Sequence, residues 1–372
     1  MGRPLPHLQR WPDRAGPHLL RADPTDGRPV TESVRKRRAL PWLVGVVAVA
    51  GTAAVISNVR GLGELLGQTD WTRVVPALLL TGLSYACISA GLVSLGRAVG
   101  VSAPRWPMMR IAFISVAVNQ LISFGGVAGY SLRAVLSKRY GVTTGDALAM
   151  SLVHSYLNNL AMFFLLGLGL LQLVRDPATD EAWRRTLEAG GMLVVAFLVV
   201  STVAMFSGRL RGALVHGSAR LAARLFPTRW SDPIEFSLRD LDIALGRTAT
   251  ALRHDPAAAW WPCVFLLLDW LAAFAVLWLC LDAVGEPVAI GVLLGGFSIG
   301  VVAGFASLVP GGLGVQDGSL AAVLALQGIP VDRAVLGTLL FRLVYYVVPF
   351  LTTLPVYASF LRQQEVEAGL KG

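Results

Sequence analysis

Charged side chains in strongly apolar surroundings are the first residues of this sequence that could do chemistry. Asp317 lies in the glycine-rich stretch "SLVPGGLGVQDGSL" (307–320), and Arg342 lies inside the long apolar run that follows it. Arg133 follows a second glycine-rich stretch, and Asp269 is the only acid near the middle of its apolar run. A charge at bilayer depth is costly and marks a functional site by default. An arginine there must meet a carboxylate, a phosphate or water.

These charged groups also have structural interpretations. Arg342 either forms an ion pair with Asp317 or Asp269 or binds a ligand, and the sequence leaves the two open. Asp269 either titrates or pairs with an arginine. Polar residues in the apolar run at 147–174 are expected to act as hydrogen-bonding groups between helices. They are Ser151, Ser155 and Asn158 on one face, with His154 and Asn159 adjoining. A lone histidine predicts no metal site.

Glycine and proline interrupt two apolar stretches near these charges. The first stretch is interrupted by Gly125 and Gly126, and the second by Pro310, Gly311, Gly312 and Gly314. A non-helical break at bilayer depth is tolerated only where it is buried in protein or faces a polar cavity. We expect the two breaks to enter from opposite faces, line one cavity and offer helix N-termini to a phosphate. The segment "GLGVQDG" misses the dinucleotide motif by one residue and follows no predicted strand.

The composition is that of an all-α polytopic membrane protein. Of 372 residues, 55% are hydrophobic and 15% are charged, which excludes an ordinary soluble domain. The net charge is +9. The charged residues lie between the apolar runs, so they set membrane topology and do not indicate nucleic-acid binding. Cys87, Cys263 and Cys280 all fall within apolar runs and predict neither a disulfide nor a zinc site. With no phosphate-binding loop for ATP, we expect no cofactor and no metal.

Hydropathy and charge together predict about six full spans and two re-entrant hairpins. Runs of about 17–25 apolar residues can cross a bilayer. Such runs lie at 40–57, 74–96, 147–174, 190–207, 259–283 and 332–359. Two more, 111–130 and 288–308, end in the glycine-rich breaks. If both were full spans, Lys138 and its basic neighbours would lie outside, against the positive-inside rule. If both turn back, the basic segments lie inside and the 175–189 loop lies outside.

The remaining segments have simple interpretations. Residues 1–39 are predicted to be a disordered, basic cytoplasmic tail. The basic 208–258 loop is predicted to be helical and to lie on the anionic inner leaflet. Asp240 and Asp242 in this loop resemble a metal-binding pair, but nearby arginines favour an ion-paired helix face. Both chain termini are therefore predicted to be cytoplasmic.

The two halves of the chain carry a matching pattern. A Gly-Gly pair opens each hairpin return, at Gly125 and at Gly311, and an Ala-Val-Leu sequence follows each pair. A turn glycine comes next, Gly141 in the first half and Gly328 in the second. The offset is 186 residues at the first pair and 187 at the second. We predict an inverted-topology repeat, 40–174 and 190–360, of the kind that places a transport site near the bilayer midplane.

The second motif also carries a family resemblance. The segment "LVPGGLGVQDGSLAAVLALQGIPVDRAVLGTLLFRLVYYVVPF" resembles the flippase-like membrane domain of lysylphosphatidylglycerol synthases, the multiple peptide resistance factors. The resemblance covers roughly residues 40–360 of the chain. The family motif falls on Pro310, Gly311, Gly312, Gly314, Asp317 and Arg342, and Arg133 lies at the arginine of the first motif. Asp317 replaces the usual glutamate, and Gly129-Tyr130 replaces a Gly-Glu pair. We expect no synthase domain, because the chain ends soon after the last span.

The resemblance implies lipid translocation rather than an enzyme activity. Arg133 and Arg342 would neutralise the phosphate of a membrane lipid while its acyl chains stay in the bilayer of the cell membrane. Lipid-biosynthesis enzymes are the expected partners. Two alternatives stay open. The first is a membrane-embedded transferase acting on polyprenyl or phospholipid substrates, which normally needs clustered carboxylates and Mg²⁺. The second is a scaffold that recruits partners through the 208–258 loop.

Overall fold

The computed structural model describes residues 69–122, 127–175, 181–225, 228–306 and 314–369, together with Gly67 and Gly312. Every element within these ranges is a helix, as the composition predicted. The predicted tail 1–39 and the predicted span 40–57 lie outside the described residues. So do Gly125, Gly126, Pro310 and Gly311.

Two helices form the centre of the described fold. α3 (Trp71–Ala98) packs along α10 (Trp260–Ala283) more extensively than any other pair. The Asp70 amide donates to the Ala283 carbonyl oxygen at 2.7 Å, so the start of α3 lies beside the end of α10. Asp70 caps α3 by accepting hydrogen bonds from the side chain and backbone of Thr72, which hold the pKa of its carboxyl below its usual range.

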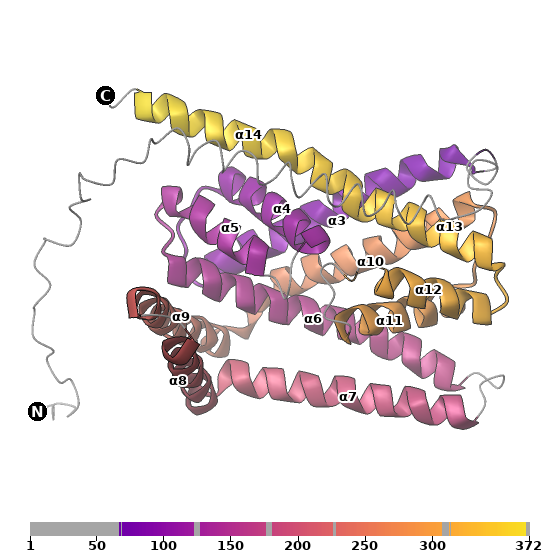
Figure 1. Cartoon of the computed structure of the whole chain (residues 1–372), viewed down its shortest axis with the longest axis horizontal. Coiled ribbons are helices and arrows are strands. Elements are labelled where there is room, and N and C mark those ends of the chain that lie inside the picture. The colour runs from indigo at the N-terminus through magenta and orange to yellow at the C-terminus, as the bar shows by residue number, and fades with distance from the viewer. Residues whose placement is uncertain are drawn as a thin grey trace, which may run out of the picture. The chain divides into compact units, whose positions relative to one another are not determined.

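Further helices surround this pair directly or through a neighbouring helix, and Figure 1 shows α6, α7 and α14 among them. They are α6 (Thr144–Arg175), α7 (Glu181–Phe206), α13 (Val331–Arg342), the π-helical segment η4 (Leu343–Val347) and α14 (Val348–Gly369). Among the described residues, four stretches are long and apolar enough to span a bilayer: Trp71–Ala98, Thr144–Gln172, Pro256–Ala283 and Val331–Phe360. A fifth exists if Leu187–Val203 and the bent helix after it count as one span. The prediction of spans near 74–96, 147–174, 259–283 and 332–359 is confirmed. The full set of six is not reached within the described ranges.

The two glycine-rich segments join pairs of short helices that pack against each other. α4 (Arg105–Ile122) and α5 (Val127–Ser137) form one pair, and α11 (Ile290–Ala306) and α12 (Val315–Leu326) form the other. In Figure 1 the first pair lies towards the left of the view and the second towards the right. Neither pair forms one continuous span, because the second helix of each pair runs back along the first.

The matched sequence pattern corresponds to matched local structure. The turn glycines Gly141 and Gly328 both have positive φ, 77° and 91°, a conformation that favours glycine. The next long helix begins three residues later in each half, at Thr144 and at Val331. The correspondence is therefore local and geometric as well as compositional.

The basic 208–258 loop is helical, as predicted. α8 (Gly208–Leu225) packs against α9 (Thr228–His254), and α9 packs against α6 before η2 (Pro256–Ala259) leads into α10. Arg211 of α8 pairs with Asp242 of α9 at 2.6 Å, and Arg247 of α9 pairs with Asp146 of α6 at 2.6 Å. Asp242 thus belongs to an ion-paired helix face, which was the expected interpretation.

The glycines of α11 make close helix packing possible. A Cβ added at Gly300 would lie 3.0 Å from Leu320 Cβ of α12, and one at Gly304 would lie 3.0 Å from Gln316 Cβ. A Cβ at Gly291 would instead collide with Gln172 of α6. Small residues here let the helix backbones approach one another, which is how membrane helices gain packing contacts.

Candidate functional site

Arg133 is buried inside the first hairpin, where its described side-chain partners are hydroxyl groups. Its side chain is 1% exposed. Nε and Nη2 donate to Ser115 Oγ of α4 at 3.1 and 3.0 Å, and Nη1 donates to Ser151 Oγ of α6 at 2.9 Å. The ring centroid of Tyr130 lies 6.0 Å from its Cζ. Among the described residues, no acidic side chain lies within ion-pair distance of this guanidinium.

Both serine hydroxyls are oriented to accept from Arg133. Ser115 Oγ donates its proton to the Ala112 carbonyl oxygen, 3.0 Å away, and Ser151 Oγ donates to the Ala147 carbonyl oxygen at 2.7 Å. The lone pairs of each hydroxyl are therefore left for the guanidinium. These neutral acceptors satisfy hydrogen bonds but do not neutralise the charge, so an anion would be stabilised beside Arg133.

Gly129 sets the close approach of the two helices around Arg133. The Gly129 amide donates to Asn119 Oδ1 of α4 at 2.7 Å. A Cβ at this position would lie 2.2 Å from the Ser115 carbonyl oxygen and 2.4 Å from Asn119 Cγ. Only glycine lets α5 lie this near α4, and this contact brings Arg133 within reach of Ser115.

Arg342 and Asp317 form the ion pair that was one of the two sequence interpretations. Arg342 Nε lies 2.7 Å from Asp317 Oδ1, with side-chain exposures of 2% and 15%. Arg342 Cζ also lies 4.7 Å from the ring centroid of Tyr346, whose hydroxyl accepts from Gln316 Nε2 at 3.3 Å. The partner is Asp317 and not Asp269.

The second glycine-rich segment presents Asp317 at the start of α12. Gly314 precedes this helix with φ of 77°, and Gly312 has φ of 62°. The Gly314 amide donates to Asp317 Oδ2 at 3.2 Å. A carboxylate in the first turn also interacts favourably with the positive end of the helix dipole. Asp317 is therefore held by a backbone amide on one oxygen and by Arg342 on the other.

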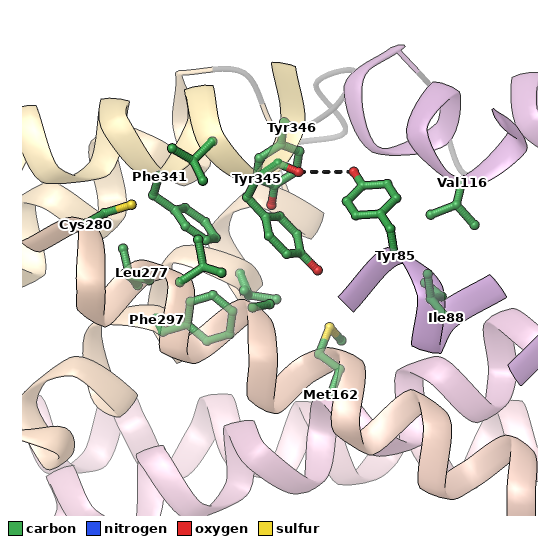
Figure 2. Close-up of a cluster of buried hydrophobic side chains, with 14 of the residues drawn as sticks. Tyr85, Ile88, Val116, Met162, Leu277, Cys280, Phe297, Phe341, Tyr345 and Tyr346 are labelled. Atoms are coloured by element: carbon green, nitrogen blue, oxygen red, sulfur yellow. Dashed lines mark hydrogen bonds between the residues drawn. The ribbon is translucent and has the colours of Figure 1, made fainter. Parts of the chain in front are cut away.

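Asp269 lies in a third polar cluster, between α3, α10 and η4. It is 3% exposed. Ser84 Oγ donates a short hydrogen bond to Asp269 Oδ1, and the Tyr345 hydroxyl donates to the same oxygen at 3.3 Å. Tyr85 donates to the Tyr345 carbonyl oxygen at 3.1 Å, which is the dashed line in Figure 2. The alternative in which Asp269 pairs with an arginine is wrong within the described part of the chain.

The sequence-predicted residues therefore occupy separate places. Asp317 and Arg342 are brought together, and Asp269 contacts Tyr345, three residues after Arg342. Arg133 lies apart, in the first hairpin. The other helix of that hairpin, α4, contacts the central core, because Phe113 of α4 packs edge-on against Tyr85 with ring centroids 5.7 Å apart. Tyr85 packs in turn against Tyr345 at 5.7 Å.

Sequence reasoning did not single out Ser84, Tyr85 or Ser115. Their only signal is a polar group in an otherwise apolar run, which many packing serines share. The polar residues of α6 act largely as expected. His154 Nε2 lies 3.1 Å from the Ile88 carbonyl oxygen, and Asn158 Oδ1 accepts from Trp270 Nε1 at 3.0 Å.

Comparison with known proteins identifies the family. The model of the lysylphosphatidylglycerol synthase TM region matches residues 42–352, which is most of the chain. The chain belongs to this family. It is also 25% identical, over 313 residues, to a phosphatidylglycerol lysyltransferase of Staphylococcus haemolyticus, covering 84% of this chain and 32% of the relative. The protein of the same name in Staphylococcus aureus strain COL is 24% identical over 279 residues, covering 75% of this chain and 28% of the relative.

The chain thus spans about a third of the length of the curated relatives that it matches. The family model is that of a membrane region, in agreement with the apolar helices described above. This chain is therefore a multi-pass membrane protein of the lysylphosphatidylglycerol synthase TM family. The resemblance recognised in the Pro310–Arg342 region is confirmed.

Proposed function

We propose that this protein moves a phosphate-bearing lipid across the cell membrane. The observation that carries the proposal is Arg133, a buried guanidinium whose described partners are neutral hydroxyls. A lipid phosphate supplies the missing negative charge and can accept two of the guanidinium hydrogen bonds at once. Arg342, released from Asp317, would provide a second cation for the same phosphate.

The arrangement of the hairpins supports transport rather than static binding. The pairs α4–α5 and α11–α12 fold back on themselves at glycine-rich segments, and the turn glycines Gly141 and Gly328 share a left-handed conformation. We propose that residues 40–174 and 190–360 are inverted repeats whose hairpins enter from opposite faces. Such repeats alternate access by rocking about a site between them.

The proposed orientation places both termini, Lys138 and α8–α9 in the cytoplasm. Basic residues then lie inside, as the positive-inside rule requires. The site would comprise Arg133, Asp317, Arg342 and Asp269, with Gly312, Gly314 and the Gly-Gly pairs shaping the breaks. Enzymes of lipid biosynthesis are the partners we expect, because they would supply the lipid on the inner leaflet.

The named relatives are phosphatidylglycerol lysyltransferases, and we propose that the membrane region they share with this chain moves the lipid. Its aligned part covers only a third of those proteins. Within the described residues no three His, Cys, Asp or Glu side chains gather as a metal-binding group. A transferase that relies on clustered carboxylates and Mg²⁺ therefore gains no support from the described side chains.

Reconstitution tests the proposal. The purified protein is placed in vesicles of phosphatidylcholine and phosphatidylglycerol with a fluorescent phosphatidylglycerol, and an impermeant reductant quenches the outer leaflet. We expect the wild type to bring inner-leaflet lipid to the outer leaflet. Arg133→Gln should slow this movement by about tenfold or more, because hydrogen bonds to charged groups contribute about 1.5–3 kcal/mol.

Two further variants make the test specific. Arg133→Lys keeps the charge but loses the two-pronged geometry, so we expect an intermediate rate. Arg185→Gln is the matched control, because Arg185 is 74% exposed and pairs only with Glu181 among the residues described. Unchanged movement in Arg133→Gln would contradict the proposal and favour a scaffold. Magnesium-dependent turnover of a labelled lipid donor would favour a transferase.

A further inference from the structure

Asp269 is a carboxyl group in the protein core whose described partners are hydroxyl groups. It lies in the middle of α10, and Ser84 from α3 and Tyr345 from η4 both donate to Oδ1. The Ser84 and Tyr345 hydroxyl oxygens also lie 2.8 Å from each other. In the described part of the chain, both of these hydrogen bonds reach the same oxygen, and no ion pair joins the carboxyl to a Lys or Arg.

The other described ionisable groups around Asp269 form no ion pair with it. Tyr85 and Cys87 on α3 and Tyr345 and Tyr346 on η4 are uncharged at neutral pH. Two groups on neighbouring helices are engaged elsewhere. His154 of α6 bonds to the Ile88 carbonyl oxygen, and Arg342 at the end of α13 pairs with Asp317. Burial makes an ionised carboxylate costly here, and the hydrogen bonds from Ser84 and Tyr345 partly offset that cost.

A short segment connects Asp269 to the ion pair of the second hairpin. Tyr345 belongs to the π-helical segment Leu343–Val347, which begins directly after Arg342. π-Helical turns inside α-helices are frequent at functional sites. A change at Asp269 alters the hydrogen bond of Tyr345, and Tyr345 lies one helical turn from the residue that holds Asp317. Figure 2 shows Tyr345 and Tyr346 within the same side-chain cluster as Phe341 and Tyr85.

We propose that Asp269 is a proton-binding site that couples lipid movement to the transmembrane proton gradient. The inference rests on the proposed lipid translocation and supplies its source of energy. A proton enters from one side and neutralises Asp269, the Tyr345 contact adjusts, and the Arg342–Asp317 pair opens for the lipid phosphate. The proton leaves to the other side of the membrane when the protein returns to its starting conformation.

Proteoliposomes with the membrane potential clamped by valinomycin and potassium test this coupling. With one proton moved per lipid, a gradient of about one pH unit should hold fluorescent phosphatidylglycerol at an about tenfold ratio between leaflets. Asp269→Asn mimics the protonated acid, so its ratio should stay near unity. Tyr345→Phe keeps the ring but removes the donor, and it should weaken the response without unfolding the protein.

Asp282→Asn is the matched control on the same helix. Asp282 lies at the end of α10, where it pairs with Arg73, so the gradient response should be retained. A second readout is independent of transport. The infrared difference spectrum between acid and alkaline buffer should contain a buried carboxyl band that Asp269→Asn removes and Asp282→Asn keeps.

The outcomes separate this inference from the proposed function. Lipid movement that ignores the pH gradient in the wild type, or a gradient response that persists in Asp269→Asn, would overturn the coupling alone. A response to an imposed sodium gradient in place of the proton gradient would also overturn it. Absence of any lipid movement by the folded wild type would overturn lipid translocation, and the coupling with it.

Discussion

Arg133 and Arg342 are both buried guanidinium groups, but their charges are balanced differently. Arg342 has a carboxylate partner in Asp317, whereas Arg133 is held by Ser115 and Ser151. The difference follows from sequence. Asp317 stands beside the second hairpin break, while Tyr130 replaces the acid that the family resemblance leads one to expect before Arg133. We infer that Arg133 is prepared for an incoming anion and that Arg342 must first leave its partner.

The Arg342–Asp317 pair gives a prediction at the scale of single residues. Removing one partner of a buried ion pair leaves an uncompensated charge and costs on the order of 3–5 kcal/mol. Asp317→Asn leaves the more deeply buried Arg342 charge without its partner, so it should be the more destabilising change. Arg342→Gln leaves Asp317, which is more exposed and keeps its hydrogen bond from the Gly314 amide. The double variant should be less destabilised than the sum of the two. Unfolding in mixed detergent micelles measures all three.

Additive losses in that cycle would contradict the ion pair as a stabilising contact. Asp317→Glu serves as the conservative variant and should retain both stability and lipid movement. Asp317→Asn, in contrast, should abolish lipid movement even under conditions where it stays folded, because Arg342 can no longer re-form the pair and release the phosphate.

The helix hairpins carry the next prediction, at the scale of elements. A Cβ at Gly129 would lie 2.2 Å from the Ser115 carbonyl oxygen, so α4 and α5 must separate in Gly129→Ala. Forcing an extra group into a packed site costs about 1–3 kcal/mol. The shift also moves Arg133 away from Ser115, so both stability and lipid movement should fall.

Gly82→Ala is the control for that substitution. Gly82 lies in α3 with no atom within 4 Å of an added Cβ, so the change should be neutral or stabilise the helix by up to about 1 kcal/mol. Thermal unfolding of the detergent-solubilised variants compares them. Equal stability of the two variants would mean that α4 and α5 do not need their close contact.

The sequence predicts helices better than it predicts their partners. The predicted run 259–283 differs from α10 by one residue at its start, because a long apolar stretch is itself the signal. The run 332–359 contains the π-helical segment Leu343–Val347. The sequence did not predict this segment, because hydropathy carries no information on hydrogen-bond register. α7 begins at Glu181, ahead of the predicted 190, because a helix continues into polar residues beyond its apolar part.

The sites show the same limit. Asp317 and Arg342 were singled out as charges in apolar runs, and their pairing was one of two open alternatives. The Ser115–Arg133–Ser151 arrangement joins three helices, and no spacing in the chain predicts which helices meet. The Ser84–Asp269–Tyr345 cluster likewise depends on the packing of α3 against α10 and η4, which is a property of the tertiary fold.

At the scale of the whole molecule, the proposed topology decides whether the hairpins can share one transport site. Hairpins entering from opposite faces allow alternating access, whereas full spans at 111–130 and 288–308 would remove it. The segment between α5 and α6 distinguishes the two, because it is cytoplasmic only if α4 and α5 turn back. Lys138 in this segment is exposed and available for labelling.

Cysteine labelling on a background without Cys87, Cys263 and Cys280 tests this topology. Lys138→Cys should resist a membrane-impermeant maleimide in intact cells and react once the membrane is permeabilised, because the basic segment is held inside. Arg185→Cys, 74% exposed at the start of α7, should react in intact cells and serves as the external control. Labelling at position 138 from outside would mean that the first hairpin crosses the membrane, and Arg133 would then lie on a different path from Arg342.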